Sequence, residues 1–538
     1  MSYERVIGTN PILKMDYPDP DVIRVGDTFY MITTTMHFMP GAEILKSYDL
    51  INWEHETYVF DRLDSTLGQR LEGQEQIYGK GMWAATLRFY EGVFYVLFVC
   101  NDTQKTYLYR SEDVTGVLES GQELKLYELS WSKSNVEGFY HDASLLFDEG
   151  KAYLVYGNTD IFLTQLNEEL TGPEQGGLNG RILRDEDNHQ LGYEGSHLYK
   201  INGRYYLFLI HSLKDRWRRV EAAFMADSLE DFMEGRYIGG DVFDDDMGFR
   251  NSGIAQGGIV EGPDGVWNAV LFQDSGAIGR IPVLVPVTFR EDGYPVFGNC
   301  GKAPKDLDMQ SLRAGYDYKL LVDSDDFRYN PKGTFLEDRK NYGSFGFKSM
   351  WQFNHEPDMK LVKCDSERGC LWIKTDKLSK NIYFARNILT QRMIFPKCSA
   401  EVTLDVSKLK DGDSAGLAAF QGNYAWVGVT KNVGKCYAVM TSFINTSGDV
   451  WNLSQEPGKV LETVLLESDI IRLRLTAEFE NDTVLCEIDM GQGFRRIGTL
   501  HQLTFRLDHF TGCRFGLFVY SEKEAGGSAG FLDFKYIK

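Results

Sequence analysis

Three acidic residues stand in sequence contexts that would present a carboxyl group to a ligand. They are Asp19 in Pro18-Asp19-Pro20, Asp142 in His141-Asp142-Ala143-Ser144 and Glu194 in Tyr193-Glu194-Gly195-Ser196. Prolines on both sides restrict the backbone around Asp19, and the small residues after Asp142 and Glu194 leave room above these acids. Two carboxyl groups, one ionised as a base and one protonated as an acid, are what hydrolysis of a glycosidic bond requires.

The chemistry depends on whether the three acids surround one axis. If they do, their repulsion raises the pKa of the least solvated carboxyl, which then holds a proton near neutral pH. The competing interpretation is that these acids end strands or bind a cation in a channel. The elements that carry the acids decide between the two.

A degenerate repeat indicates that the acids converge. Five times an apolar, aromatic-rich run follows a turn built on glycine, and the turn glycines are Gly26, Gly92, Gly150, Gly203 and Gly265. This repetition, with strand-like residues on both sides of each turn, is typical of a five-bladed β-propeller. Seven to nine residues before the glycines stand Asp19, Trp83, Asp142, Glu194 and Gln256. The innermost strand of each blade lines the central channel, so these positions are expected to meet there.

The chain is long enough for two domains. Residues 1–310 contain the repeats and are predicted to form the propeller. The stretch from Gly301 to Gly315 shows neither alternation nor repeat character, and residues 311–324 are assigned to a linker. In residues 325–538, alternating segments such as 398–406 and 471–479 indicate half-buried antiparallel strands. The predicted fold class is therefore all-β, a five-bladed β-propeller followed by a β-sandwich of the concanavalin-like or jelly-roll type.

Charge and cysteine usage restrict the partners. The chain has 57 basic and 78 acidic residues, a formal net charge of −21. This charge disfavours nucleic acid, an anionic membrane surface and acidic polysaccharides, and it favours a neutral substrate. There is no membrane-spanning apolar run and no apolar signal-peptide core at the first residues. Eight scattered cysteines without Cys-x-x-Cys spacing predict reduced thiols and a cytoplasmic protein, with a bridge between Cys364 and Cys370 as the alternative.

Further residues are expected near the channel. An aromatic and apolar group, an arginine and His37 are candidates for substrate binding, and three more histidines are candidates for the channel wall. They are Trp83, Phe38 and Met36, then His37, His141, His197 and His211, and finally Arg280. The first group would form a sugar-stacking surface, although such residues also fill blade cores. The histidines are expected in the channel wall, and the arginine would bind a hydroxyl or offset repulsion among the acids. The sequence has no Ser-His-Asp arrangement, no phosphate-binding glycine loop and no metal-ligand spacing of histidines.

A series of motifs extends over nearly the full length of the chain. They are Asn10–Asp21, the Pro40-Gly41 step, Lys46–Trp53, Gly81–Ala84, His141–Ser144, Glu194–Lys200, Trp351–Pro357 and Ala385–Arg392. With these motifs the chain resembles glycoside hydrolase family 43. Its second half is similar to the β-sandwich of the β-xylosidase and α-L-arabinofuranosidase members. The resemblance implies an inverting exo-glycosidase.

The resemblance also implies a role for each matching residue. Asp19 would be the general base that activates water, and Glu194 the general acid that protonates the leaving oxygen. Asp142 would tune the pKa of the acid and orient it, while Arg280 and Trp83 would match the family's active-site arginine and tryptophan. Inversion leaves room for a water, so the carboxyl groups of Asp19 and Glu194 are expected to lie about 6.5–9.5 Å apart.

One position departs from the family. Where many members carry a histidine beside a bound calcium, this chain has Gln256, which would line the substrate site. Calcium prefers several oxygen ligands, so a structural calcium is in doubt, and no cofactor is expected for the chemistry. In exo-acting relatives a loop of the second domain closes the pocket, and Glu522–Gly530 is the candidate here, with an ordinary surface loop as the alternative.

These observations favour a β-xylosidase that releases xylose from xylooligosaccharides and also has α-L-arabinofuranosidase activity. A dedicated α-L-arabinofuranosidase acting on arabinose-substituted oligosaccharides is the close alternative. A sugar-binding propeller without catalysis is the alternative from another class, although all three acids are present. An endo-acting arabinanase is disfavoured because it would need an open groove. Relatives of this type lead us to expect a homo-oligomer.

Overall fold

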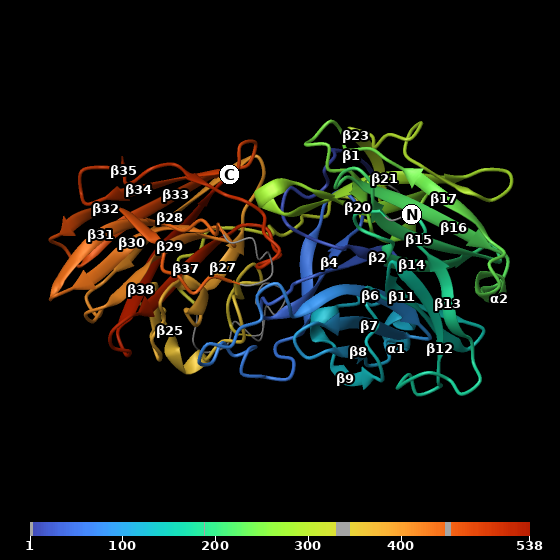
Figure 1. Cartoon of the computed structure of the whole chain (residues 1–538), viewed down its shortest axis with the longest axis horizontal. Helices are drawn as coiled ribbons and strands as arrows, with labels where there is room; N and C mark the ends of the chain where they lie inside the picture. The colour runs from blue at the N-terminus through green and yellow to red at the C-terminus, as the bar shows by residue number, and fades with distance from the viewer. Residues whose placement is uncertain (1–3, 188, 330–344, 447–452) are drawn as a thin grey trace.

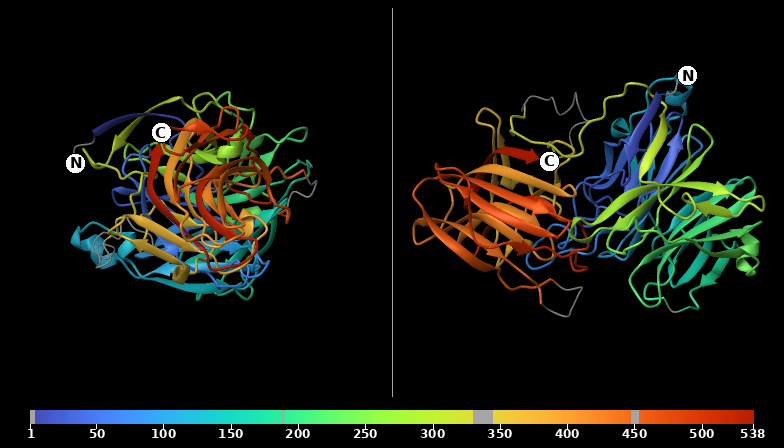
Figure 2. Two further views of the ribbon diagram at one scale, coloured as in Figure 1. Left: turned by 90° about the vertical axis from the view of Figure 1, so that its left-hand side faces the viewer. Right: turned by 90° about the horizontal axis from the view of Figure 1, so that it is seen from above.

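The computed structural model of the chain describes residues 4–187, 189–329, 345–446 and 453–538. Two β-rich bodies lie against each other, with the propeller on the right and the second domain on the left in Figure 1. The view from above in Figure 2 shows the same two bodies in contact. The arrangement confirms the predicted fold class, a five-bladed propeller followed by a β-sandwich.

The propeller is built from five antiparallel sheets in chain order, each beginning at the channel. Blade 1 contains β2 (Asp21–Val25), β3 (Thr28–Thr33), β4 (Gly41–Ser47) and β5 (Glu54–Phe60). Blade 2 contains β6 (Met82–Tyr90), β7 (Val93–Cys100), β8 (Lys105–Ser111) and β9 (Trp131–Val136). Blade 3 contains β10 (Ser144–Asp148), β11 (Lys151–Asn158), β12 (Asp160–Leu166) and β13 (Asn179–Arg184).

The last two blades follow the same plan. Blade 4 contains β14 (Glu194–Ile201), β15 (Arg204–Ser212), β16 (Arg219–Ala226) and β17 (Ile238–Phe243). Blade 5 contains β18 (Ile254–Ala255), β19 (Ile259–Glu261), β20 (Trp267–Asp274), β21 (Arg280–Phe289) and β22 (Pro295–Phe297). Two short helices, α1 (Thr115–Ser120) and α2 (Leu229–Met233), lie in connections. Among the described residues no helix is long and apolar enough to cross a membrane.

The turn glycines explain the repeat. Each joins the first strand of a blade to its neighbour, and all five have positive φ, from +62° at Gly26 to +82° at Gly203. Residues with a side chain rarely adopt this left-handed conformation, so glycine is favoured at every one of these turns. The apolar runs that follow are buried in the blades, as in β3, where all six residues are buried.

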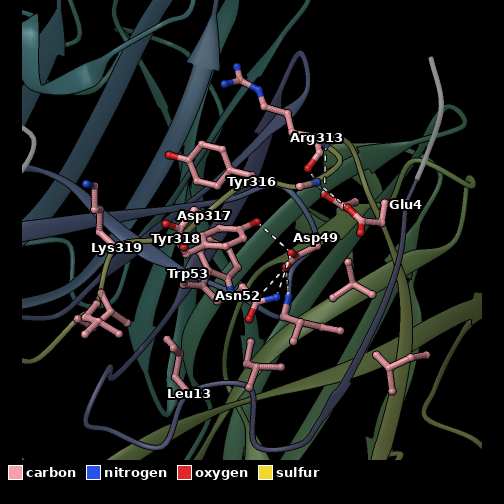
Figure 3. Close-up of a pocket in the computed structure, with 18 of the residues that line it drawn as sticks. Glu4, Leu13, Asp49, Asn52, Trp53, Arg313, Tyr316, Asp317, Tyr318 and Lys319 are labelled. Atoms are coloured by element: carbon pink, nitrogen blue, oxygen red, sulfur yellow. Dashed lines mark hydrogen bonds between the residues drawn. The ribbon is translucent and has the colours of Figure 1, made fainter.

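The segment after the fifth blade differs from the sequence prediction. The stretch from Gly301 to Gly315 was expected to lack strand character, but it contains β23 (Asp306–Ser311), which pairs with β1 (Glu4–Thr9). Residues 311–324 then pack on blade 1, where the Tyr318 hydroxyl donates to Asp49 at 3.0 Å and lines an open groove (Figure 3). The assigned linker is therefore anchored on the propeller by side-chain contacts.

The second domain is a sandwich of two sheets. One has the order β24 (Gln352–Phe353), β27 (Leu389–Arg392), β37 (Arg514–Ser521), β29 (Asp413–Phe420), β30 (Ala425–Asn432), β31 (Lys435–Ser442) and β32 (Lys459–Leu466). The other has the order β25 (Val362–Asp365), β26 (Cys370–Lys374), β38 (Ser528–Ile537), β28 (Lys397–Asp405), β33 (Ile470–Glu478), β34 (Thr483–Asp489) and β35 (Arg495–Arg496), with β36 (His501–Gln502) also on β34. Alternating residues of the two sheets fill the core between them, as the sequence pattern predicts.

Direct bonds join the sandwich to the propeller on the side of the channel mouth. Met39 and Phe353 exchange two backbone hydrogen bonds of 3.0 and 2.7 Å. Buried Arg392 pairs with Glu43 of blade 1 at 2.8 Å, and the Cys513 N–H donates to the Ala277 carbonyl at 2.9 Å. These contacts hold a sandwich loop over the propeller.

Candidate active site

A cavity of about 710 Å³ opens where the innermost strands of the five blades begin. It is lined by all five repeat-derived channel positions, Asp19, Trp83, Asp142, Glu194 and Gln256. Arg280 and Met36, two of the other candidates, line it as well. The repeat therefore located the cavity correctly, because equivalent positions in successive blades face one axis.

The backbone at three of these positions has the same unusual conformation. Asp19, Asp142 and Gln256 have φ values of +51°, +46° and +54°. Left-handed conformations cost side-chain-bearing residues energy, and they persist at functional sites when the surroundings impose them. At Asp19 the two flanking prolines contribute to that constraint. In blade 4 it is Gly195, next to Glu194, that takes the left-handed conformation, at +64°.

Asp19 is buried and held by two donors. The Thr34 hydroxyl donates to one carboxylate oxygen at 2.8 Å, and the Arg280 guanidinium pairs with the other. Arg280 is itself positioned by Asp274, whose carboxylate lies 3.4 Å from Nε, and by the ring of Phe510 at 5.1 Å. The carboxylate of Asp19 is thus oriented from both sides and faces the cavity.

Glu194 and Asp142 form a second acidic group around His141. The His141 Nε2 atom lies 3.5 Å from Glu194 Oε2 and 3.7 Å from Asp142 Oδ2. Asn158 donates to the same Glu194 oxygen. Burial lowers the pKa of His141, but the charges of Asp142 and Glu194 outweigh this effect and raise it to about 9. His141 is therefore protonated at neutral pH.

Of the two carboxyl groups beside His141, that of Asp142 has the raised pKa. Burial and the charges of Glu194 and Asp19 raise the pKa of Asp142 to about 6. Burial also raises the pKa of Glu194, but its hydrogen bond to His141 and the positive charges of His141, Arg219 and Arg280 outweigh burial and lower it. Repulsion was expected to raise the pKa of the least solvated carboxyl, and the raised pKa is that of Asp142, because positive charges beside Glu194 favour its ionised form.

Several lining residues were missed from the sequence. They are Asn158, Leu191, Trp217, Arg219, Asp274, Phe505, Leu507 and Phe510. Asn158 ends β11 beside the channel, so its place in the repeat could have identified it. Arg219 pairs with Asp274 at 2.9 Å, and Trp217 stacks over Arg219 at 4.5 Å. The three residues of 505–510 come from the sandwich, and no repeat in the propeller could have indicated them.

The aromatic wall spans both domains. Trp83 lies with its ring centroid 5.5 Å from His141 and 5.8 Å from Phe510. The loop that carries Phe510 is anchored at Gly512, whose N–H donates to buried Asp16 at 2.8 Å. The predicted closing loop, Glu522–Gly530, does not line the cavity, and its last three residues belong to β38. The sandwich does close the pocket, but with residues 505–510.

Two predicted substrate-binding residues lie elsewhere. Phe38 is buried with the Arg514 guanidinium 3.6 Å from its ring, and His37 is buried against Tyr78 and His509. Neither lines the cavity. The backbone reverses at Met36, which has a φ of +52°, so Met36 faces the cavity while the next two residues face the sandwich.

The centre of the propeller offers a poor ligand set for calcium. Asp21 accepts hydrogen bonds from the Leu87 N–H at 2.8 Å and from Arg88 at 2.6 Å through one oxygen. Its other oxygen has no hydrogen-bond partner in the part of the chain that the structure describes, and it lies 3.8 Å from His197 Nε2. One free carboxylate oxygen beside an arginine does not fit the six to eight oxygen ligands that calcium takes. These residues therefore do not fit a calcium ion.

The comparisons with known proteins agree with this geometry. The family model "Glycosyl hydrolases family 43" matches residues 8–295, and the model "Beta xylosidase C-terminal Concanavalin A-like domain" matches residues 340–537. The chain belongs to glycosyl hydrolase family 43. It is a glycoside hydrolase of the xylosidase and arabinosidase type, and the reading as a sugar-binding propeller without catalysis is set aside.

Relatives of this family 43 hydrolase share both domains. A β-xylosidase from Formosa agariphila is 26% identical, with 97% of this chain and 88% of that protein covered. The solved structure of a bifunctional GH43-CE protein from Bacteroides eggerthii is 36% identical with a TM-score of 0.85, covering 99% of this chain and 64% of that one. A GH43 enzyme engineered to display both endo-xylanase and exo-arabinofuranosidase activity is 28% identical, with a TM-score of 0.84 and 99% of both chains covered.

Proposed function

We propose that this family 43 hydrolase is an inverting exo-glycosidase that removes xylose from the non-reducing ends of β-1,4-xylooligosaccharides and also cleaves α-L-arabinofuranosides. The observation that carries the proposal is one cavity that is lined both by Asp19 and by the Glu194–Asp142 group. A dedicated α-L-arabinofuranosidase is the alternative, because a pocket for xylopyranose can accept an arabinofuranose with similar hydroxyl positions.

Asp19 is the proposed general base. Arg280 and Thr34 each hold one of its oxygens, so the carboxylate is oriented toward the cavity. A water between Asp19 and the anomeric carbon would lose its proton to this carboxylate as it attacks. The expected separation of about 6.5–9.5 Å between the carboxyl groups of Asp19 and Glu194 stays a prediction of inversion.

Glu194 is the proposed general acid, and it must carry a proton when the sugar is bound. A neutral sugar that fills the pocket displaces water and adds to the burial that raises a carboxyl pKa. That proton would come from solvent, because His141 beside it, with its raised pKa, holds its own proton more tightly than the Glu194 carboxyl does. Asp142 stabilises the positive charge on His141 and would orient the acid.

The shape of the site favours exo-cleavage. Phe505, Leu507 and Phe510 reach over the propeller from the sandwich and line the same cavity as the acids. A pocket walled on that side holds the end of a chain, whereas an endo-acting enzyme needs a groove open at both ends. We further propose a cytoplasmic homo-oligomer, a location that agrees with eight free cysteines.

Proton NMR of xylobiose hydrolysis tests the proposal most directly. We expect α-xylose to appear first and then mutarotate, because attack by water from the face opposite the leaving group inverts the anomeric carbon. Early β-xylose would mean retention and would overturn Asp19 as general base. The same measurement on an arabinoxylooligosaccharide decides between the two sugars, and hydrolysis of the arabinoside alone would favour the dedicated arabinofuranosidase.

A further inference from the structure

Three side chains of the cavity offer a nitrogen and two oxygens in a compact group. His141 Nε2 lies 3.5 Å from Glu194 Oε2 and 3.7 Å from Asp142 Oδ2, and the ligand atoms of the three residues all lie within 4.8 Å of one another. Ligand atoms of a tetrahedral zinc site stand about 3.3 Å apart, because each bond is about 2.0 Å long. The two separations from His141 are close to that value, and the separation between the two carboxylates is at most 4.8 Å.

The carboxylate of Asp142 is the observation that points to a ligand. The side chain is nearly buried, with 8% of the residue exposed, yet among the described residues no hydrogen bond reaches its carboxylate oxygens. It lines the cavity and faces His141 across a gap too long for a strong hydrogen bond. The charged neighbour that faces this carboxylate is His141 at 3.7 Å, so its oxygens can still take a cation that enters the cavity.

We propose that His141, Asp142 and Glu194 form an inhibitory site for a divalent transition metal such as Zn²⁺ or Cu²⁺. One imidazole and two carboxylates are a ligand set that zinc accepts, and the fourth position faces the cavity. Asn158 donates to Glu194 and would orient that ligand from the second coordination sphere. Mg²⁺ and Ca²⁺ are disfavoured because they require about six oxygen ligands.

The neighbouring arginines do not oppose a cation strongly. Arg280 is paired with Asp19 and Arg219 with Asp274, so each guanidinium already faces a carboxylate. The Glu194–Asp142 pair is left with His141 as its close cationic partner, and a metal would replace the proton on that imidazole. The bound ion would occupy the acid and its orienting carboxylate, which blocks proton donation to the leaving oxygen. The inhibition, unlike the binding, rests on the proposed function.

Calorimetric titration of the full-length protein with Zn²⁺ tests the binding. We expect one Zn²⁺ per chain in the wild type, no matching isotherm with Mg²⁺, and at least about tenfold weaker binding in His141→Gln, since even outer-sphere changes cost that much. The matched control is His501→Gln, because His501 is buried in the sandwich and bonded to Ser442. Wild-type affinity in His141→Gln, or absence of zinc binding in the wild type, would overturn the site.

A second variant and a competition experiment complete the test. Glu194→Gln removes another ligand and should weaken Zn²⁺ binding similarly, which covers the case in which His141→Gln does not fold.

Xylose at saturating concentration should weaken Zn²⁺ binding, because both occupy the same cavity. Zinc should abolish hydrolysis and a chelator should restore it. Zinc binding without any glycosidase activity would refute the proposed function and leave the metal site standing, whereas activity unaffected by saturating bound zinc would refute the inhibition.

Discussion

At the residue scale, Asp19 combines a left-handed backbone with two fixed donors, Thr34 and Arg280. Replacing Asp19 by Asn keeps the shape but removes the base. We expect kcat/KM to fall about 10²–10⁴-fold on every substrate, aryl glycosides included, because all of them need an activated water. Steady-state kinetics check this, with the exposed surface change Asp308→Asn as control. A loss below tenfold would contradict the base role.

The proposed role of Glu194 as general acid predicts unequal losses of activity on two kinds of substrate. In Glu194→Gln, hydrolysis of xylobiose should fall about 10²–10⁴-fold, whereas an aryl xyloside with a good leaving group should lose far less, since it needs little protonation. The ratio of the two kcat/KM values is the measurement. Equal losses on both substrates would mean that Glu194 is not the proton donor.

At the scale of elements, the loop before β37 carries the wall of the pocket across the domain boundary. Phe510 contacts Arg280 at 5.1 Å and Trp83 at 5.8 Å. Phe510→Ala should lower kcat/KM for xylobiose about 2- to 12-fold, the equivalent of one aromatic contact worth about 0.5–1.5 kcal/mol. A matched control is Phe494→Ala, which removes a sandwich ring that stacks on Arg474 and does not line the pocket. Equal effects of the two variants on kcat/KM would show that the loop does not contribute to the active site.

At the scale of the whole molecule, three buried histidines lie at the domain interface. His37 contacts His509 with ring centroids 4.8 Å apart and His355 at 5.5 Å, and burial holds the pKa of all three below the usual range, to about 3 for His509. The charged groups that face them are Arg514 and Lys377, which also lower their pKa values. The domains thus meet through neutral imidazoles.

These histidines predict a loss of stability in acid. Each is neutral when folded but takes up a proton when unfolded below pH about 6.5, so its contribution is complete above that pH and is lost as the pH falls toward 3. The free energy of unfolding should drop by up to about 1.4 kcal/mol per pH unit for each histidine. Melting temperatures from pH 7 to 5 should therefore depend less on pH in His509→Gln than in the wild type.

His211 is the matched control, because its predicted effect on stability in acid has the opposite sign. Burial lowers the pKa of His211, but its hydrogen bond to Asp241 outweighs burial and raises it, so His211 stabilises the fold at low pH. Removing it in His211→Gln should make the decline in acid steeper. A His509→Gln profile parallel to the wild type would show that the interface histidines do not govern acid stability.

Much of the site followed from local sequence. The five turn glycines adopt the positive φ that favours glycine, so the sequence shows the repeat of the blades. The repeat in turn identifies the channel positions, which lie seven to nine residues before each glycine. Phe38 and His37 were placed wrongly, because the chain reverses at Met36 and no local pattern records the direction of a side chain after such a turn. The strand β23 was missed because its partner β1 lies about 300 residues away.

What the sequence by itself determined is the blade repeat, the all-β class and the set of acids at the channel, since these depend on backbone preferences and period-two patterns within short segments. Only the tertiary structure decided which carboxyl has the raised pKa, because that depends on distances from Asp142 and Glu194 to His141, Arg219 and Arg280. It also decided that residues 505–510, rather than 522–530, wall the pocket. Charge interactions and domain packing join segments hundreds of residues apart, and no local pattern contains those distances.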